Sequence, residues 1–547
     1  MFDKRFSLLI FLFVILCSAA IDATNYYSDP SSKGNMSNRG SSESPWSSLS
    51  SIFSSLKTFQ AGDTIFLRTG NHGYASIKGF NSGFVVITPE AGQEPILSRV
   101  GVSSASFWKL YKLTVQSESS GAALKGDYAL IELFGTASDI TVSSCKIQSN
   151  DNTTNWTRDD WRKRCNWGIS TRDRLNSNFI IEDNSIRNVS LGLSISSSKC
   201  KVRRNTVQYF TNDGSRVLGS DILFEKNKVM DLMKVMSVAE NHDDLFQAFA
   251  YAAGGLGQQV LRNDTISGNL FMATSDTNRP FVGSIQGMGC FDGPFENWIV
   301  ENNIVMCDSW HGISLYAATN CKIINNTVLD PYAVTPVDPF DNNKSSIGPA
   351  WVFLDGASTN NIVKNNLANK MNFAAGVNTT AASNYVVGDI STTSSIFVNV
   401  SNITAPGTYD LHLKPGSLPV DKGDNVDAPS VDFDGDPRPQ GSKVDVGAYE
   451  FNPDLSAVRL VSDSKKISIY PNPFHGEINV DLGNIYSKSV NVDFLNLNGQ
   501  LIANQKLQTN SSILQIKNLA DLACGIYFVK LTDDKGDCNF GKITKVN

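Results

Sequence analysis

The stretch I-I-E-D-N-S-I at residues 180–186 recurs in varied form along the middle of the chain. In each copy an Asn stands among β-branched and aliphatic residues, which predicts two short strands joined by a tight turn. Successive copies lie 21 to 23 residues apart, or 34 to 42 residues apart where a loop is inserted. The recurring residues are Asn184, Asn205, Asn227, Asn269, Asn303, Asn326 and Asn366, with Cys145 in the same position one repeat earlier.

A second marker precedes these asparagines by 13 to 16 residues: W-G-I-S, L-G-L-S, D-G-S-R and H-G-I-S, around Gly168, Gly192, Gly214 and Gly312. Two strand markers at a fixed offset in a coil of about 22 residues predict a parallel β-solenoid. Its coils would stack about 4.8 Å apart, so that the Asn side chains form a ladder along the axis. The asparagines are therefore expected to hold turns rather than to catalyse a reaction.

The repeat resembles the right-handed parallel β-helix proteins of the pectate-lyase-like superfamily. N-Y-Y-S-D-P-S-S-K-G, S-P-W-S-S-L-S-S-I and A-G-D-T-I-F-L-R-T-G are similar to the N-terminal cap and first coils of its polysaccharide lyases. D-F-D-G-D-P-R-P and V-D-V-G-A-Y-E-F, at 432–439 and 444–451, resemble the closing segment of secreted β-helix proteins. This resemblance covers roughly residues 25–450. It implies an all-β fold and suggests activity on polysaccharides.

Both ends of the chain carry export signals. Lys4 and Arg5, a short apolar run and small residues at 18–23 predict a signal peptide over residues 1–23. I-S-I-Y-P-N-P-F (467–474) and L-A-C-G-I-Y-F-V-K-L (522–531) resemble a type IX secretion C-terminal sorting domain, whose alternating pattern predicts a small β-sandwich. We therefore expect a β-helix domain at 24–452, a linker at 453–466 and a sorting domain at 467–547. The resemblance implies the type IX machinery as partner and a Bacteroidota-type cell surface or medium.

The composition limits the partners. The net charge is −6 and the sequence pI is about 5.5, which disfavours nucleic acid. After the signal peptide no segment is apolar enough to span a membrane, so we expect an exported monomer without a membrane span. Nine cysteines leave eight once Cys17 is removed, which an oxidising compartment permits to pair.

Aligning the coils on their Gly-containing strands brings the unusual polar residues into one column. Strands two coils apart lie about 10 Å from each other, so these side chains are expected to share one groove. Two of the five histidines of the chain belong to this set. The predicted catalytic residues are Asp213, Arg216, His242, Asp243, Asp244 and His311, with Gln247, Gln286, Asp292 and Trp310 as substrate contacts.

Two reactions fit this column. By resemblance to pectate-lyase-type enzymes, acidic side chains would hold Ca²⁺ on a uronate carboxylate, with Asp213, Asp243 and Asp244 as its ligands or as hydrogen-bond partners. Arg216, His242 and His311 would then neutralise charge and transfer protons, and His is the less demanding base. The result would be β-elimination in an acidic polysaccharide.

The second reaction is hydrolysis. N-D-G (212–214), D-D (243–244) and W-H-G (310–312) stand in the order of the N-x-D, D-D and G-H-G motifs of polygalacturonase-type β-helix glycosidases. This resemblance implies that Asp213, Asp243 and Asp244 are the carboxylate set and that His311 supports it. The spacings are longer here, Trp310 replaces the first Gly, and no R-I-K follows.

Sugar contacts are also expected from a loop at 151–167, which holds three Trp together with Arg162 and Arg164. Trp faces stack on sugar rings, and the arginines would attract carboxylates or sulfates. The insertion A-Y-A-A-G-G-L-G-Q-Q (250–259) would form a groove wall. Our interpretation is an exported enzyme that cleaves an acidic polysaccharide, with lyase chemistry ahead of hydrolysis. A non-catalytic carbohydrate-binding surface protein and a uronan epimerase are the alternatives.

Overall fold

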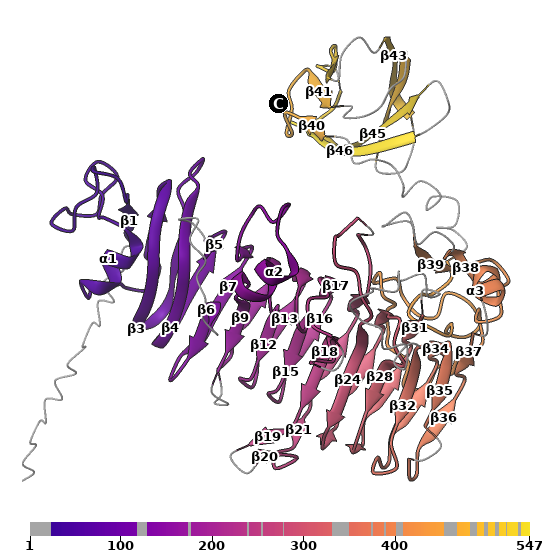
Figure 1. Ribbon diagram of the computed structural model, residues 1–547. Helices are drawn as coiled ribbons and strands as arrows, with labels where there is room; N and C mark the ends of the chain where they lie inside the picture. Colours follow the sequence, from indigo (N-terminus) through magenta and orange to yellow (C-terminus); the bar gives the residue numbers. More distant parts are fainter. Residues whose placement is uncertain are drawn as a thin grey trace, which may run out of the picture. The chain divides into compact units, whose positions relative to one another are not determined.

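The Asn and Gly markers of the sequence lie next to the first residue of short strands, and these strands stack in parallel from coil to coil (Figure 1). The computed structural model describes residues 23–117, 128–172, 177–237, 240–252, 255–276, 278–330, 349–373, 376–387, 390–400, 409–452, 468–481, 489–496, 501–508, 513–520, 522–533 and 538–546. The rest of the predicted signal peptide, before Ala23, and the predicted linker lie outside these residues. The chain divides into two compact units, Met1–Phe451 and Asn452–Asn547.

The first unit contains a 32-stranded parallel sheet that winds through three stacks. Strands β1 (Asn25–Ser28), β2 (Thr64–Leu67), β3 (Gly70–Pro89) and β4 (Pro95–Tyr111) begin it, after which the coils divide. The glycine stack contains β6 (Ala129–Phe134), β9 (Trp167–Thr171), β12 (Leu193–Ile195), β15 (Ser215–Val217), β18 (Asp244–Phe249), β24 (Gln286–Asp292), β28 (His311–Leu315), β32 (Trp351–Leu354) and β35 (Lys370–Asn372).

The other two stacks complete each coil. The middle stack contains β7 (Ser138–Ser143), β10 (Ile180–Glu182), β13 (Lys201–Arg203), β16 (Leu223–Glu225), β22 (Thr265–Ser267), β26 (Ile299–Glu301), β30 (Lys322–Ile324), β33 (Ile362–Lys364) and β36 (Thr380–Ala382). The asparagine stack contains β5 (Thr114–Gln116), β8 (Lys146–Gln148), β11 (Ser185–Val189), β14 (Thr206–Phe210), β17 (Lys228–Leu232), β23 (Leu270–Met272), β27 (Ile304–Met306), β31 (Thr327–Leu329), β34 (Leu367–Ala368) and β37 (Tyr385–Val386).

The predicted Asn ladder is confirmed. Each Asn Oδ1 accepts from the backbone N–H and the Nδ2 of the Asn one coil earlier; for example, Asn303 Oδ1 accepts from Asn269 at 3.0 and 2.9 Å. Each Nδ2 also donates to a backbone carbonyl, as Asn303 does to Ile266 at 2.8 Å. The ladder continues past the predicted set to Asn384. It satisfies buried polar groups at the turn of every coil.

The glycines are required by close packing between coils. A Cβ on Gly192 would lie 2.3 Å from the carbonyl oxygen of Gly214, and one on Gly312 would lie 2.2 Å from Val328. The core inside the coils is aliphatic and aromatic, with Phe224, Phe246 and Phe271 in mutual contact. Successive coils are therefore held together by backbone hydrogen bonds between their strands and by apolar packing of the side chains inside the coils.

Shorter elements decorate the solenoid. They are α1 (Leu49–Ser54), α2 (Arg158–Arg164), α3 (Ile390–Ile396), β19 (Tyr251–Ala252), β20 (Gly255–Leu256), β21 (Leu261–Arg262), β25 (Phe295–Glu296), β29 (Ala318–Thr319), β38 (Phe397–Asn399) and β39 (Asp410–Leu413). α3, β38, β39 and the closing segment pack on the outward residues of the late asparagine stack, among them Ile304, Met306 and Leu329. The late asparagine stack is therefore covered by this layer.

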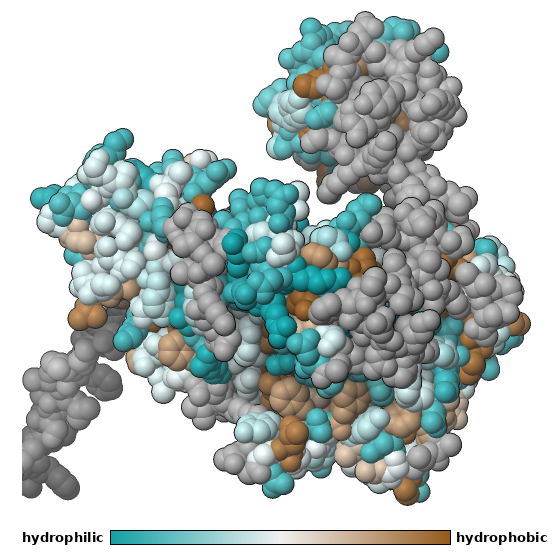
Figure 2. All heavy atoms as spheres, in the orientation of Figure 1, coloured by the Kyte–Doolittle hydropathy of each residue, from teal (hydrophilic) through white to brown (hydrophobic). Residues whose placement is uncertain are grey.

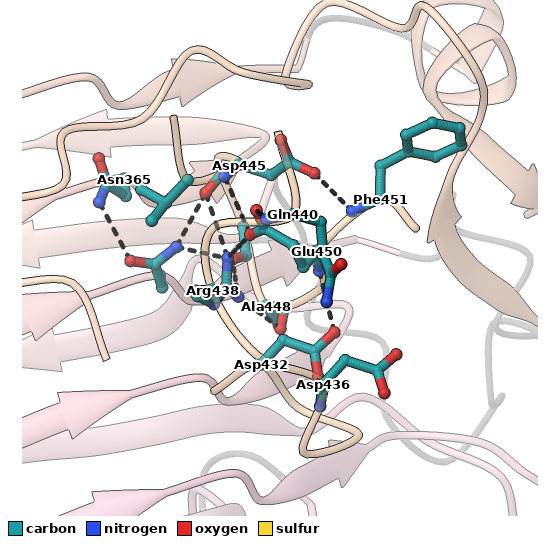
Figure 3. Close-up of polar contacts among 12 residues, drawn as sticks. Asn365, Asp432, Asp436, Arg438, Gln440, Asp445, Ala448, Glu450 and Phe451 are labelled. Atoms are coloured by element: carbon teal, nitrogen blue, oxygen red, sulfur yellow. Dashed lines mark hydrogen bonds and ion pairs between the residues drawn. The ribbon is translucent and has the colours of Figure 1, made fainter. Parts of the chain in front are cut away.

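The closing segment is held by a buried arginine (Figure 3). Arg438 Nη1 lies 2.7 Å from Glu450, and both side chains are fully buried. The same guanidinium donates to the carbonyls of Gly447 and Ala448. Asp432 accepts from the backbone N–H groups of Asp434, Asp436 and Glu450. Burying this charge is tolerated because Nη1 and Nη2 both donate to several acceptors, although Nε has no hydrogen-bond partner.

The second unit is a small antiparallel sandwich. One sheet is β40 (Ser468–Tyr470), β41 (Ile478–Asp481) and β44 (Ile513–Ile516); the other is β43 (Leu501–Gln508), β42 (Ser489–Leu495), β45 (Gly525–Asp533) and β46 (Cys538–Lys545). It has its own apolar core. The predicted fold class, a right-handed parallel β-helix followed by a small β-sandwich, is confirmed. None of the described helices is long and apolar enough to cross a membrane.

Candidate active site

The predicted polar column lies on the glycine stack. Arg216 of β15 pairs with Gln247 of β18, and Asp244 of β18 pairs with Gln286 of β24. His311 begins the next strand of the stack, β28. The backbone register therefore brings these predicted residues onto four consecutive strands, and the insertion before β18 does not disturb it.

The three aspartates each face a different cation. Asp213 accepts from Arg216 Nε at 2.6 Å, Asp243 accepts from Lys234 Nζ at 2.7 Å, and Asp244 lies 3.1 Å from His242 Nδ1. Asp213 also accepts from the backbone N–H of Asp244 at 2.9 Å. Each carboxylate is thus paired with its own cationic side chain, although the three acids remain close enough to raise one another's pKa.

All three carboxyl groups are almost completely shielded, with 0% exposure for Asp213 and Asp244 and 2% for Asp243. Burial raises the pKa of Asp213, although Arg216 opposes the shift. Burial likewise raises the pKa of Asp243 to about 7 against the effect of Lys234, and that of Asp244 to about 8 against the effect of His242. Of the cations paired with these acids, Arg216 and His242 are partly exposed, with side-chain exposures of 21% and 53%, whereas Lys234 is as buried as Asp243.

His242 is the exposed member of this cluster. Its side chain is 53% exposed, and the hydrogen bond to Asp244 raises its pKa. Gln247 Nε2 donates to the same Asp244 oxygen at 3.1 Å, whereas Asp244 Oδ1 is buried without a hydrogen-bond partner. Because the two shifts are linked, the His242–Asp244 pair retains a proton at neutral pH.

His311 has the opposite character. Burial and the nearby His242 lower the pKa of its imidazole to about 4, so it is neutral at physiological pH. Its Nδ1 lies 2.9 Å from Ser314 Oγ, which also accepts from Trp351 Nε1 at 3.1 Å. When Nδ1–H donates to Ser314, the Nε2 lone pair is available as a base.

A pocket of about 270 Å³ opens beside the acid cluster. A Cβ on Gly289 would lie 2.2 Å from Asp244 Oδ1, so only glycine fits between the acid and the pocket. Leu256, on the β19–β20 hairpin, supplies one wall, as predicted for the insertion. The lining residues are His242, Gln247, Ala248, Phe249, Leu256, Gly289, Phe291 and Asp292. Gln247 and Asp292 are thus in position to contact a ligand.

The other two predicted contacts lie outside this pocket. Trp310 is 40% exposed, one coil farther along. Gln286 is partly buried, and its Oε1 has no hydrogen-bond partner. Both lie next to the pocket in the stacking order, so both remain predicted contacts.

The loop at 151–167 forms α2, whose surroundings are hydrophilic on the face seen in Figure 2. Trp161 is buried against Met233 and Val235 instead of being presented to a sugar. Arg162 pairs with Glu240 at 3.1 Å and Arg164 pairs with Asp160 at 3.2 Å. Neither arginine lines the pocket, so the structure does not bring these two predicted contacts to the acid cluster.

Sequence reasoning missed several site residues. Lys234 is 1% exposed and neutralises Asp243, and its signal was a single cation within the apolar run M-D-L-M-K-V-M. Arg158 of α2 donates to the carbonyl of Lys234, which anchors the helix to this loop. Phe291 and Ser314 carried no sequence signal, because their importance comes only from their neighbours on adjacent coils.

The predicted calcium ligands do not form a shared set. Asp213, Asp243 and Asp244 turn toward separate cations, and no group of three metal-binding side chains occurs among the described residues. Ca²⁺ prefers six to eight oxygens around one point. This arrangement does not fit a resident calcium ion.

Comparison with known proteins identifies the second unit. Residues 468–544 match the secretion system C-terminal sorting domain. This domain indicates type IX secretion to the cell surface or beyond it, in agreement with the sequence-based prediction. No curated protein matches the chain.

Several solved structures resemble the chain at low identity. A GH136 lacto-N-biosidase from Eubacterium ramulus is 11% identical over 66% of this chain and 67% of that chain, with a TM-score of 0.30. A periplasmic alginate epimerase is 12% identical over 60% and 61%, with a TM-score of 0.24. The surface protein and adhesin PfbA of Streptococcus pneumoniae is 9% identical over 60% and 90%, with a TM-score of 0.28. These values carry no argument about activity.

Proposed function

We propose that this exported β-helix protein is a lyase that cleaves an acidic polysaccharide by β-elimination. The observation that supports it is a pair of histidines with opposite pKa shifts beside one pocket. The pKa of His311 is lowered to about 4, whereas that of His242 is raised by Asp244. Both rings contact Phe291, with centroids 4.6 and 6.0 Å away. Groups whose pKa values are driven apart in one site are suited to act as base and acid.

The reaction assigns one task to each group. Neutral His311 takes the C5 proton of a uronate, and the electron pair of that C–H bond forms the C4–C5 double bond. The C4–O bond breaks, and the leaving oxygen receives a proton from His242, which Asp244 keeps protonated. Arg216, which is 21% exposed, stabilises the uronate carboxylate while Asp213 fixes its guanidinium.

The burial of the acids favours this reaction over hydrolysis. A glycosidase of the polygalacturonase type needs carboxyl groups that touch the sugar and an attacking water. Here the carboxyl groups of Asp213, Asp243 and Asp244 are buried, and each is paired with a cationic side chain: Arg216, Lys234 and His242, respectively. They are therefore assigned as positioning residues, and the proposed catalytic residues are His242, His311 and Arg216.

The test is incubation of the purified protein with pectate, alginate and glycosaminoglycans. With one of these substrates, we expect the ultraviolet absorbance to increase as an unsaturated uronate product forms. EDTA should not change the rate of this increase. His311→Gln and His242→Gln should each lower the rate at least about 100-fold, the usual scale for general acid–base groups. His475→Gln, in the second unit, is the matched control. New reducing ends without the absorbance would establish hydrolysis instead, and binding without cleavage would establish a binding protein.

A further inference from the structure

Next to the pocket, five aromatic side chains from three neighbouring strands form a closed ring. The members of this aromatic ring are Phe291, His311, Trp351, Phe353 and Tyr316. Around it, successive ring centroids lie 4.6, 5.6, 5.0, 5.3 and 5.4 Å apart. The strands β24, β28 and β32 supply all five except Tyr316, which directly follows β28.

The aromatic ring is not part of the solenoid core. In the same strands the core positions are taken by Met288, Ile313 and Val352, which are fully buried and pair with one another. The five aromatic side chains are only partly buried. Folding alone therefore does not account for a cluster of aromatic groups on the outward face of these coils.

The cluster is held in a fixed geometry. Ser314, on the strand between Phe291 and Phe353, contacts His311 at 2.9 Å and Trp351 at 3.1 Å through its hydroxyl. Trp351 and Phe353 stack at 23°, and most of the other contacts are edge-on. A rigid aromatic surface loses little conformational entropy when a ligand binds.

Two exposed side chains extend this surface. Trp310 is 40% exposed, and its ring lies 5.9 Å from Trp351. The exposed Lys370 places its ammonium 4.8 Å from the centre of the Trp351 ring. An exposed Trp310 ring next to an ammonium that lies over the Trp351 ring matches a sugar ring that carries a carboxylate or sulfate.

We propose that the aromatic ring, with Trp310 and Lys370, is a subsite for an anionic sugar residue adjacent to the one cleaved. It rests on the proposed function, because His311 belongs to both the catalytic pair and the aromatic ring. The polysaccharide runs along the solenoid axis, from the pocket beside β18 and β24 toward β32 and β35. Lys370 provides the preference for charged over neutral sugars.

Binding measurements separate this subsite from catalysis. The binding measurements use His242→Gln as the background protein, because its slow cleavage leaves the ligand intact. Calorimetry measures its binding of oligosaccharides of polygalacturonate, alginate and chondroitin sulfate, with neutral dextran fragments for comparison. Trp310→Ala should weaken binding of the preferred oligosaccharide about tenfold, which corresponds to one lost stacking contact. Lys370→Gln should weaken the charged ligands to a similar extent, and Lys370→Arg should restore binding.

Matched controls are available on other surfaces. Phe80→Ala removes a ring that is 66% exposed on β3, and Lys201→Gln removes an exposed cation on β13, in the middle stack. Both should bind as the background protein does. Near-ultraviolet circular dichroism confirms that each variant keeps its packing.

Each outcome addresses one proposal. If the unaltered protein cleaves a polysaccharide but Trp310→Ala and Lys370→Gln bind as tightly as the background, the subsite is refuted and the lyase proposal stands. If those variants lose affinity although no cleavage occurs on any substrate, the aromatic ring is a binding site for an anionic sugar and the lyase proposal fails. If Lys370→Gln loses affinity only for carboxylated or only for sulfated oligosaccharides, that difference identifies the anionic group that Lys370 recognises.

Discussion

The pKa of the Asp244 carboxyl group shows how strongly burial changes a single residue. Its ordinary pKa of 3.8 is raised to about 8, and one of its oxygens has no hydrogen-bond partner. The carboxyl group is tolerated in this place because it can hold a proton and because His242 and Gln247 contact its other oxygen. This position thus costs stability as the pH rises, which is a testable property of the residue.

The free energy of unfolding should therefore fall as the pH rises from 3.8 toward about 8. A carboxyl group whose pKa is raised in the folded state binds its proton more tightly there than in the unfolded state. Its contribution to stability is therefore complete below the pKa of the unfolded state and is lost as the pH rises through the pKa of the folded state. Asp244→Asn cannot ionise and should show a flatter dependence. Thermal unfolding across this pH range measures it, with Asp151→Asn, at an exposed position, as control. Parallel curves for Asp244→Asn and the unaltered protein would contradict the burial argument.

The rate of cleavage should depend on pH through the same groups. Activity is expected to rise as the pH passes about 4, where His311 loses its proton, and to fall above about 8, where the His242–Asp244 pair loses its own. In Asp244→Asn the alkaline limb should move down toward 6.5, the ordinary value for His242. A pH profile of kcat/KM measures both limbs. If the alkaline limb of that variant is not shifted, Asp244 does not control the pKa of the general acid, His242.

At the scale of elements, each coil depends on the amide contacts of the one beside it. Asn303→Ala would leave the backbone N–H and Nδ2 of Asn269 and the carbonyl of Ile266 without these partners. Each buried group left unsatisfied costs about 1–3 kcal/mol. The melting temperature should drop clearly, and more than in Asn384→Ala at the partly exposed end of the ladder. Equal losses at the two positions would mean that the ladder contributes little in the interior.

These elements were predictable from sequence because they repeat. The Asn and Gly markers lie on consecutive coils with fixed backbone surroundings, so alignment alone placed Asp213, Arg216 and His311 on one face. The loops do not repeat, and their contacts follow only from packing. Trp161, expected to be available to a sugar, is buried, and Lys234, unnoticed in its apolar run, neutralises Asp243.

The contacts of the acids and of the aromatic side chains could not be predicted from the sequence. Asp243 and Asp244 were recognised as a pair of acids, but the cations that face them, Lys234 and His242, lie 9 and 2 positions before them in the sequence. Sequence spacing cannot tell which neighbour an acid will face. The aromatic ring was missed for the same reason, since its five members are spread over 63 residues, from Phe291 to Phe353.

At the scale of the molecule, the two units have separate cores and should fold independently. Residues 23–452 expressed alone should retain the thermal transition of the solenoid and the catalytic rate of the full chain. In a host with type IX secretion, the same truncation should abolish export, because the sorting domain at 468–544 is absent. Fractionation and immunoblotting measure the distribution. Export of the truncated protein would contradict the assignment of the second unit.

The Asn ladder has a consequence for how such a protein can change. Its contacts are the same whether neighbouring asparagines are 21 or 42 residues apart in sequence, because the extra residues leave the coil as a loop and return to the same register. Loops around the pocket can thus be lengthened, exchanged or grafted one at a time while the rod beneath them keeps its spacing. A changed loop can therefore alter the surroundings of the pocket without altering the contacts that stabilise the scaffold.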